Sequence, residues 1–280
     1  MLKRTLRERA RRLLRQTLER VAIELDERDL RRPAIVFSPH FDDETLGCGG
    51  TILKKNRAGA DVKIVFMTDG SGSHRDLVPR DALRETRRAE GLAAAGQLGV
   101  DAADVFTLAV EDGCLREHKA AAVRQVREIL LRHEPQDVFV PYRHEPPADH
   151  VATHRIVTSA LREHGEAVRV YEYPIWFWRH WPWVSVSNLE RRALWRVTKS
   201  SIASCSRSFV DFRWRVPIAD VIDRKRAALE RHGSQMARPD SDPRWPTLSD
   251  VWDGDFLECF FQAFEVFARG DVTSGITADD

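Results

Sequence analysis

The sequence has 280 residues, and its 44 basic and 43 acidic side chains leave a formal net charge of +1. A chain of this length can bury a full core, while its balanced charge gives no electrostatic basis for nucleic-acid binding. The four cysteines form no C-x-x-C pair, no apolar run reaches the length of a membrane span, and no signal peptide is recognisable, so a cytoplasmic protein is expected.

Residues 1–32 carry a helical pattern with a basic face. Leucines and alanines recur at steps of three and four residues, and the segment holds 11 Lys/Arg against 6 Asp/Glu. The pattern predicts a basic amphipathic N-terminal helix. Either its leucines pack on the domain and its arginines face solvent, or it makes a peripheral contact with an anionic membrane surface. The apolar face lacks aromatic residues, which favours the first alternative.

Apolar runs then alternate with helix-like stretches in a single domain over residues 33–270. The expected strands are 34–37, 62–68, 104–110, 137–142 and 168–173, and the expected helices include 81–98 and 117–133. This order predicts an α/β, Rossmann-like three-layer fold with a mostly parallel sheet. The dinucleotide fingerprint G-x-G-x-x-G is missing, so a nicotinamide or flavin role is not expected.

The first expected strand leads into a turn with the composition of a metal site. His40 and Asp43 are separated by two residues, so both can face one ion, and Asp42 projects at a different angle, where it can act as a base. A third ligand is expected after the fourth strand, where His150 and His154 lie four residues apart.

The motif His40-Phe-Asp-Asp-Glu44 resembles the His-Pro-Asp-Asp-Glu signature of the LmbE/PIG-L family of zinc-dependent N-deacetylases. Asp149-His150 is similar to the second block of that family. The resemblance covers residues 34–160 well and 210–235 more loosely. It implies one Zn²⁺, or another divalent transition metal, on His40, Asp43 and His150, with Asp42 as general base.

The same resemblance implies roles for further residues. Arg87 and Asp112 match positions that contact the sugar in family members. The family often has a second histidine three residues before the zinc-binding one, which helps to stabilise the oxyanion. Pro147 occupies that position here, and His144, six residues before His150, is the candidate for the role.

All eight tryptophans follow residue 175, and four lie between Trp176 and Trp183. We expect an aromatic-rich insertion at about 175–208, and either an aromatic mini-core or an aromatic wall over the crevice. Residues 209–217 alternate like a further strand, 218–232 read as a helix, 238–255 as an ordered loop and 271–280 as a tail.

The resemblance implies a zinc-dependent hydrolase that removes an N-acetyl or N-acyl group from an N-acetylglucosamine-type conjugate, using metal-activated water. The conjugate can be linked to a lipid or a polysaccharide. Two alternatives are a catalytically silent carbohydrate- or lipid-binding protein and a zinc amidase acting on a non-sugar amide. The sequence does not specify the oligomeric state.

Overall fold

The computed structural model describes residues 2–74, 76–165, 167–185, 205–238 and 242–270. Its strands form one sheet in the order β1-β7-β8-β6-β5-β2-β3-β4. They are β1 (Ile23–Glu24), β2 (Ala34–Ser38), β3 (Val62–Thr68), β4 (Val105–Val110), β5 (Asp137–Pro141), β6 (Arg169–Tyr173), β7 (Trp214–Pro217) and β8 (Phe264–Gly270). Neighbours within β6-β5-β2-β3-β4 are parallel, whereas β8 is antiparallel to β6 and β7. The sheet is therefore mostly parallel, as predicted.

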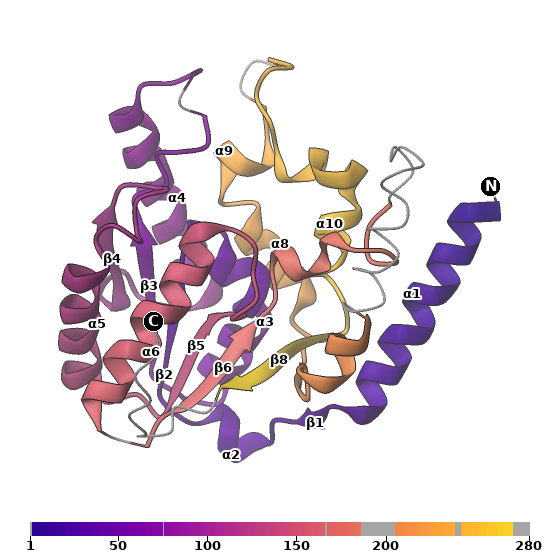
Figure 1. Cartoon of the computed structure of the whole chain (residues 1–280), viewed down its shortest axis with the longest axis horizontal. Helices are drawn as coiled ribbons and strands as arrows, with labels where there is room; N and C mark the ends of the chain where they lie inside the picture. The colour runs from indigo at the N-terminus through magenta and orange to yellow at the C-terminus, as the bar shows by residue number, and fades with distance from the viewer. Residues whose placement is uncertain (1, 75, 166, 186–204, 239–241, 271–280) are drawn as a thin grey trace.

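Helices cover both faces of this sheet (Figure 1). One face carries α5 (Lys119–His133) and α6 (Ala148–His164), and the other carries α3 (Asp43–Arg57), α4 (Arg80–Leu98) and α8 (Ile222–Leu229). Side chains of β2 alternate between the two cores: Ile35 and Phe37 join the α5/α6 side, and Val36 joins the α3 side. Strands buried on both faces produce the continuous apolar runs seen in the sequence. The three-layer α/β prediction is confirmed.

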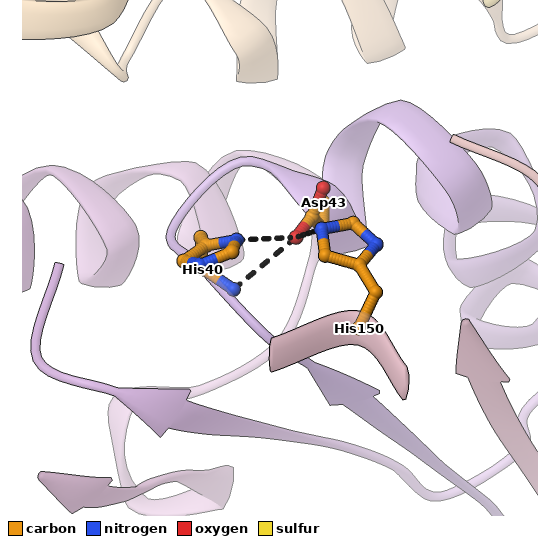
Figure 2. A group of neighbouring side chains, drawn as sticks. All are labelled: His40, Asp43 and His150. Carbon is orange, nitrogen blue, oxygen red and sulfur yellow. Dashed lines mark hydrogen bonds and ion pairs between the residues drawn. The ribbon is translucent and has the colours of Figure 1, made fainter. Parts of the chain in front are cut away.

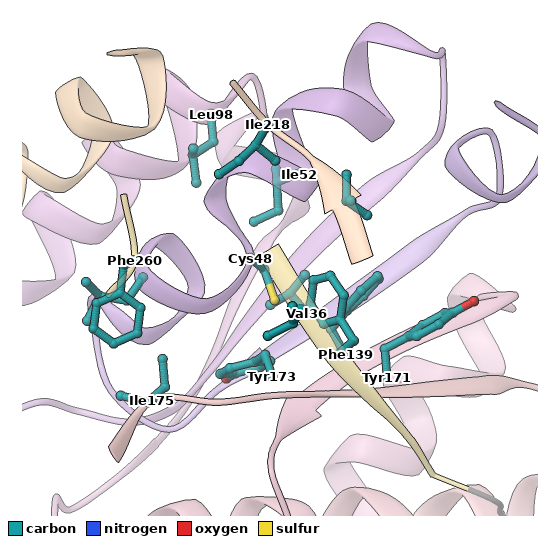
Figure 3. Packing of buried hydrophobic residues seen from close by; sticks show 14 of the residues in the cluster. Val36, Cys48, Ile52, Leu98, Phe139, Tyr171, Tyr173, Ile175, Ile218 and Phe260 are labelled. Atoms are coloured by element: carbon teal, nitrogen blue, oxygen red, sulfur yellow. The ribbon is translucent and has the colours of Figure 1, made fainter. Parts of the chain in front are cut away.

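Aromatic packing fixes the position of α3 against the sheet (Figure 3). Phe139 stacks on Tyr171 with ring centroids 5.1 Å apart. The buried Tyr173 donates from its hydroxyl to the carbonyl of Phe37 at 2.8 Å. Gly47 admits the Tyr173 ring, because a Cβ there would lie 2.3 Å from Tyr173 Cδ2. The N-terminal half of α3, which follows β2 after the turn at 39–42, is held against the sheet as a result.

A buried ion pair joins α3 to the C-terminal part of the chain. Glu265 of β8 accepts the backbone N–H groups of Gly50 at 2.8 Å and Thr51 at 2.7 Å. Lys225 of α8 donates to the Leu46 carbonyl and to Glu265, both at 2.8 Å. Buried charges are tolerated when they are paired and hydrogen-bonded in this way.

The N-terminal helix is shorter than its sequence pattern indicates. α1 (Leu2–Val21) ends before β1, which pairs with β7, and α2 (Glu27–Leu30) begins at the capping residue Asp26. The division into segments 1–32 and 33–270 stays a prediction, although β1 ties the first segment to the sheet.

Helix α1 packs along one side of the domain (Figure 1). Leu18 is buried, whereas Leu6 and Leu13 remain 64% and 65% exposed. Arg11 pairs with Glu258, so the basic face of the helix is partly neutralised by the domain. Within the described residues, no helix combines the length and the apolarity needed to cross a membrane.

The C-terminal third differs most from expectation. Residues 205–210 are helical, so β7 starts at Trp214 and not at residue 209. The expected helix over 218–232 is the shorter α8, followed by α9 (Gly233–Met236). The region 238–255 contains the 3₁₀ helix η4 (Leu248–Gly254), after which α10 (Asp255–Glu258) leads into β8. Strand β8 has no counterpart in the prediction, because its pairing partners β6 and β7 are distant in sequence. Trp195 and the predicted tail 271–280 lie outside the described residues.

Candidate active site

The turn after β2 is shaped by the buried carboxylate of Glu44. Its Oε2 accepts the backbone N–H of Asp42 at 3.0 Å, and its Oε1 lies 2.9 Å from Nε2 of His232. Ser38 Oγ accepts the backbone N–H of Glu44 at 3.0 Å. Asp42 has φ 144°, a conformation that is strained for a residue with a side chain. Such strain persists only where surrounding contacts enforce it, and it is found mostly at functional sites.

His40, Asp43 and His150 meet at this turn (Figure 2). His40 Nδ1 and His150 Nε2 each lie 3.2 Å from Asp43 Oδ2. His150 comes from the first turn of α6, more than 100 residues downstream in the chain. The ligand atoms of all three residues lie within 4.8 Å of one another, so the group can hold a metal ion.

The three side chains also fit a cation chemically. His150 is fully buried, yet neither of its ring nitrogens makes a hydrogen bond of acceptable geometry. An unsatisfied buried imidazole is costly, and a metal ion would remove that cost. Burial alone would raise the pKa of Asp43, but His150 and His40 hold it well below its usual range. Two imidazoles and a carboxylate form a ligand set that hydrolytic zinc sites use.

The second ring nitrogen of His40 faces two more carboxylates. Its Nε2 lies 3.4 Å from Asp112 Oδ1 and 3.5 Å from Asp149 Oδ2. Burial opposes a charge on the ring, but the surrounding aspartates raise the pKa of His40 well above its ordinary value. Asp149 is itself held by the backbone N–H groups of Gly113 at 2.7 Å and Leu115 at 3.3 Å. Carboxylates in this position orient a metal-binding histidine and select its tautomer.

Two other histidines, His144 after β5 and His154 on α6, lie away from the metal group. His154 Nε2 is 3.1 Å from Glu172 Oε1, so His150 is the one of the two candidates that reaches His40 and Asp43. His144 is exposed, and its ring lies edge-on to Tyr142 with centroids 5.3 Å apart. It is not among the described residues that line the cavity at the metal group.

Asp42 lies beside the metal group and faces a cavity of about 400 Å³. Burial and the neighbouring Asp43 raise the pKa of Asp42 well above its ordinary value. A cation held by Asp43 opposes this shift because it favours the charged carboxylate. The side-chain amide of Gln235 donates to Asp42 Oδ2, and its own Oε1 is buried without a partner. Asp42 thus presents a buried carboxylate at the cavity wall.

Arg87 and Asp112 line the same cavity as His40, Asp42 and Asp43, whereas the fully buried His150 and the exposed His144 do not. Arg87 is buried on α4 and donates to Ser73 Oγ at 2.9 Å, while its Nη1 has no hydrogen-bond partner. Burial lowers the pKa of the Arg87 guanidinium. Asp112 accepts the backbone N–H of Gly72 at 3.1 Å. A cation and a carboxylate at a cavity wall are groups that recognise hydroxyl-rich ligands.

The structure adds residues to which the sequence analysis gave no role. Gln235 lies at the end of the loosely matching segment 210–235, and Asp149 belongs to the Asp149-His150 motif. The position of Asp149 directly before a predicted metal ligand is the sequence feature that could have indicated its role. Glu145 carried no signal. It is buried, its Oε2 lies 3.7 Å from His150 Nδ1, and it accepts the backbone N–H of Ile175 at 2.9 Å and of Trp176 at 2.6 Å.

Comparisons with known proteins agree with this geometry. Residues 35–161 match the family described as PIG-L, GlcNAc-PI de-N-acetylase. The matched segment begins in β2 and ends in α6, and it contains His40, Asp42, Asp43 and His150.

Relatives and solved structures extend the likeness beyond that segment. A 1D-myo-inositol 2-acetamido-2-deoxy-alpha-D-glucopyranoside deacetylase from Mycobacterium sp. (strain JLS) is 27% identical over 247 residues, which is 73% of this chain and 75% of that protein. The N,N'-diacetylchitobiose deacetylase of Pyrococcus horikoshii superposes with a TM-score of 0.62 at 21% identity, covering 95% of this chain and 92% of the other.

The fold alone does not specify the reaction. GalB, a 4-carboxy-2-hydroxymuconate hydratase from Pseudomonas putida KT2440, superposes with a TM-score of 0.53 at 16% identity, over 89% of this chain and 99% of the other. Function has to be argued from the site, because one fold can carry different chemistries. The segment 35–161 is similar to a family described as a de-N-acetylase, and the metal group and Asp42 lie within it.

Proposed function

We propose that the protein is a zinc-dependent N-deacetylase that hydrolyses the acetamide of an N-acetylglucosamine-type conjugate. The observation that carries the proposal is the His40–Asp43–His150 group, of which His40 and Asp43 line one cavity together with Asp42. A bound zinc ion would supply a Lewis acid for the amide carbonyl and would lower the pKa of water. Another divalent transition metal could take the same ligands.

The protein's own residues then carry the proton transfers. Asp42, held by Gln235, takes a proton from the attacking water and returns it to the departing nitrogen. The carbonyl carbon gains the water oxygen, its bond to nitrogen breaks, and acetate and a free amine result. Arg87 and Asp112 are proposed to bind the sugar hydroxyls.

His144 is proposed as a donor to the oxyanion, following the family resemblance. Its exposed position means that the loop after β5 has to turn its ring from Tyr142 towards the cavity. Arg87 is the cation that already lines the cavity with an unpartnered Nη1.

Three predictions from the sequence stay predictions: peripheral membrane contact through residues 1–32, a lipid- or polysaccharide-linked substrate, and a cytoplasmic location. The exposed Leu6 and Leu13 support contact with an apolar surface, whereas the pairing of Arg11 with Glu258 reduces the charge available for anionic lipids. Sedimentation with phosphatidylglycerol vesicles, for the wild type and for Leu13→Glu, tests this contact directly.

The deciding experiment is acetate release from a panel of N-acetylated sugars, with and without a chelator. We expect release from N-acetylglucosamine conjugates, loss after chelation and recovery on adding zinc. Release from non-sugar amides alone would favour the amidase alternative. A protein that purifies without metal and binds the sugars without turnover would favour the silent binding protein.

A further inference from the structure

The cavity has chemically different walls on the two sides of the metal group. The sheet order places β2 between β3 and β4 on one side and β5 and β6 on the other. Polar groups, including Ser73, Arg87 and Asp112, line the β3/β4 side, together with the ring of Phe41. On the opposite side, Ile175 and Trp176 directly follow β6 and Phe256 stacks on Trp176. With Leu248 of η4, which also lines the cavity, these residues form what we call the apolar wall.

The apolar wall is built from packed and anchored side chains. Trp176 stacks on Phe256 with ring centroids 4.9 Å apart and planes at 26°. The ring centroid of Trp252 lies 6.4 Å from that of Trp176, and Trp252 does not line the cavity. Glu145, which also faces His150, accepts the backbone N–H groups of Ile175 and Trp176. One buried carboxylate thus fixes the wall relative to the metal group.

The chemistry of an amide decides which part of a substrate meets which wall. An amide carries its amine part and its acyl part on opposite sides of the carbonyl. If sugar hydroxyls face Arg87 and Asp112 while the carbonyl lies at the metal group, the acyl part points to the apolar wall. Hydroxyl groups there would lose hydrogen bonds to water without replacement. An acetyl group has a single methyl, and it leaves most of a four-residue apolar wall uncovered.

We propose that the apolar wall is a subsite for an apolar chain of the substrate, across the carbonyl from the amino sugar. This inference rests on the proposed amide hydrolysis and specifies its substrate class. Because the subsite lies across the carbonyl from the amino sugar, the apolar chain of the substrate is assigned to an acyl group longer than acetyl. An apolar aglycone has the same chemistry, and the experiment separates the two sources.

Two substrate series test the inference with the zinc-loaded full chain. One series carries N-acetyl, N-butyryl or N-hexanoyl groups on glucosamine, and the other carries methyl, butyl or octyl aglycones on N-acetylglucosamine. The released amine gives kcat/KM for each compound. Burial of a methylene favours kcat/KM by about fourfold, so we expect a rise of about fifteenfold from N-acetyl to N-butyryl, which adds two methylenes.

Substitutions in the apolar wall test whether it causes the rise in kcat/KM with chain length. Trp176→Ala should abolish the dependence on chain length, and Trp176→Phe should restore most of it. Trp252→Ala is the matched control, because it removes a ring that neighbours Trp176 but does not line the cavity, and it should keep the rise. If Trp176→Ala does not fold, Leu248→Ser at a partly exposed position should abolish the rise in its place.

Each outcome has a distinct meaning. A rise confined to the aglycone series keeps the apolar subsite and overturns its assignment to the acyl group. Equal kcat/KM along both series overturns the subsite while the deacetylase proposal stands. Amine release from no compound in either series overturns the proposed function, and the inference falls with it.

Discussion

Gln235 donates a hydrogen bond from its side-chain amide to Asp42, although 193 residues separate the two in the chain. The carboxylate proposed as general base is therefore oriented by a residue from beyond the PIG-L segment. A base has to be held within hydrogen-bond reach of the proton that it abstracts, so its supporting groups matter as much as its own identity.

Loss of this support should reduce turnover more than binding. We expect Gln235→Ala to lower kcat by about 10- to 100-fold, because a misplaced catalytic group costs about that much. KM and metal content should stay near the wild-type values. Gln16→Ala, on the exposed face of α1, is the control. An unchanged kcat in Gln235→Ala would show that Asp42 needs no such positioning.

Replacing Asp42 itself tests its role as base. Asp42→Asn should reduce kcat by about 10²- to 10⁴-fold, because the amide cannot accept the proton. Asparagine tolerates unusual backbone conformations better than most residues, so the turn at φ 144° should survive. Zinc content measured by elemental analysis should equal that of the wild type. Wild-type turnover in this variant would refute the base assignment.

The two histidines of α6 give a paired test of the metal group. His150→Ala should lose bound zinc after dialysis, because it removes one of three ligands. His154→Ala should retain zinc, because His154 interacts with Glu172. Metal-to-protein stoichiometry measures both. Retention of zinc in the first variant and loss in the second would reverse the assignment.

His144 and Arg87 are the two candidates for stabilising the oxyanion. Loss of an oxyanion donor lowers kcat by about 10²- to 10³-fold. We expect a fall of that size in His144→Ala if the proposed role is right. A normal kcat in His144→Ala, with a strong fall in Arg87→Met, would transfer the role to Arg87. Steady-state kcat and KM for one N-acetylated sugar decide between them.

A buried ion pair at the opposite end of the parallel strands predicts a stability effect. Lys55 donates to Asp137 at 2.6 Å, and both side chains are buried. Removing one partner of such a pair costs about 3–5 kcal/mol, so Lys55→Ala should unfold at a clearly lower urea concentration.

The neighbouring lysine supplies the control. Lys54 pairs with the half-exposed Asp220, and loss of a surface pair costs about 0–1 kcal/mol. Lys54→Ala should therefore unfold close to the wild type. Equal destabilisation by the two substitutions would contradict the energetic difference inferred from burial.

The sequence was most informative where local pattern and tertiary structure agree. The runs at β2, β3, β5 and β6 could be located because strands buried on both faces need continuous apolar residues. Their topology placed His40, Asp42, Asp43 and His150 at one sheet edge, and the structure brings these four residues together.

The rest depends on contacts that local patterns do not encode. Strand β8 pairs with β6 and β7, which are distant from it in sequence. Gln235 binds Asp42, 193 residues earlier in the chain, and Glu145 accepts the backbone N–H of Ile175, 30 residues later. The position of His144 depends on the path of the loop after β5, and a one-dimensional spacing rule cannot specify that path.

Glu265 of β8 accepts hydrogen bonds from two backbone N–H groups of α3, and this contact has a consequence for synthesis on the ribosome. Until that residue has emerged, the N–H groups of Gly50 and Thr51 lack their acceptor, and one edge of β6 is open to unrelated strands. Translation proceeds at about 5–20 residues per second, so a nascent chain keeps this edge uncovered for several seconds after β6 is made. Chaperone dependence and yield should therefore respond to how fast the stretch between β6 and β8 is translated.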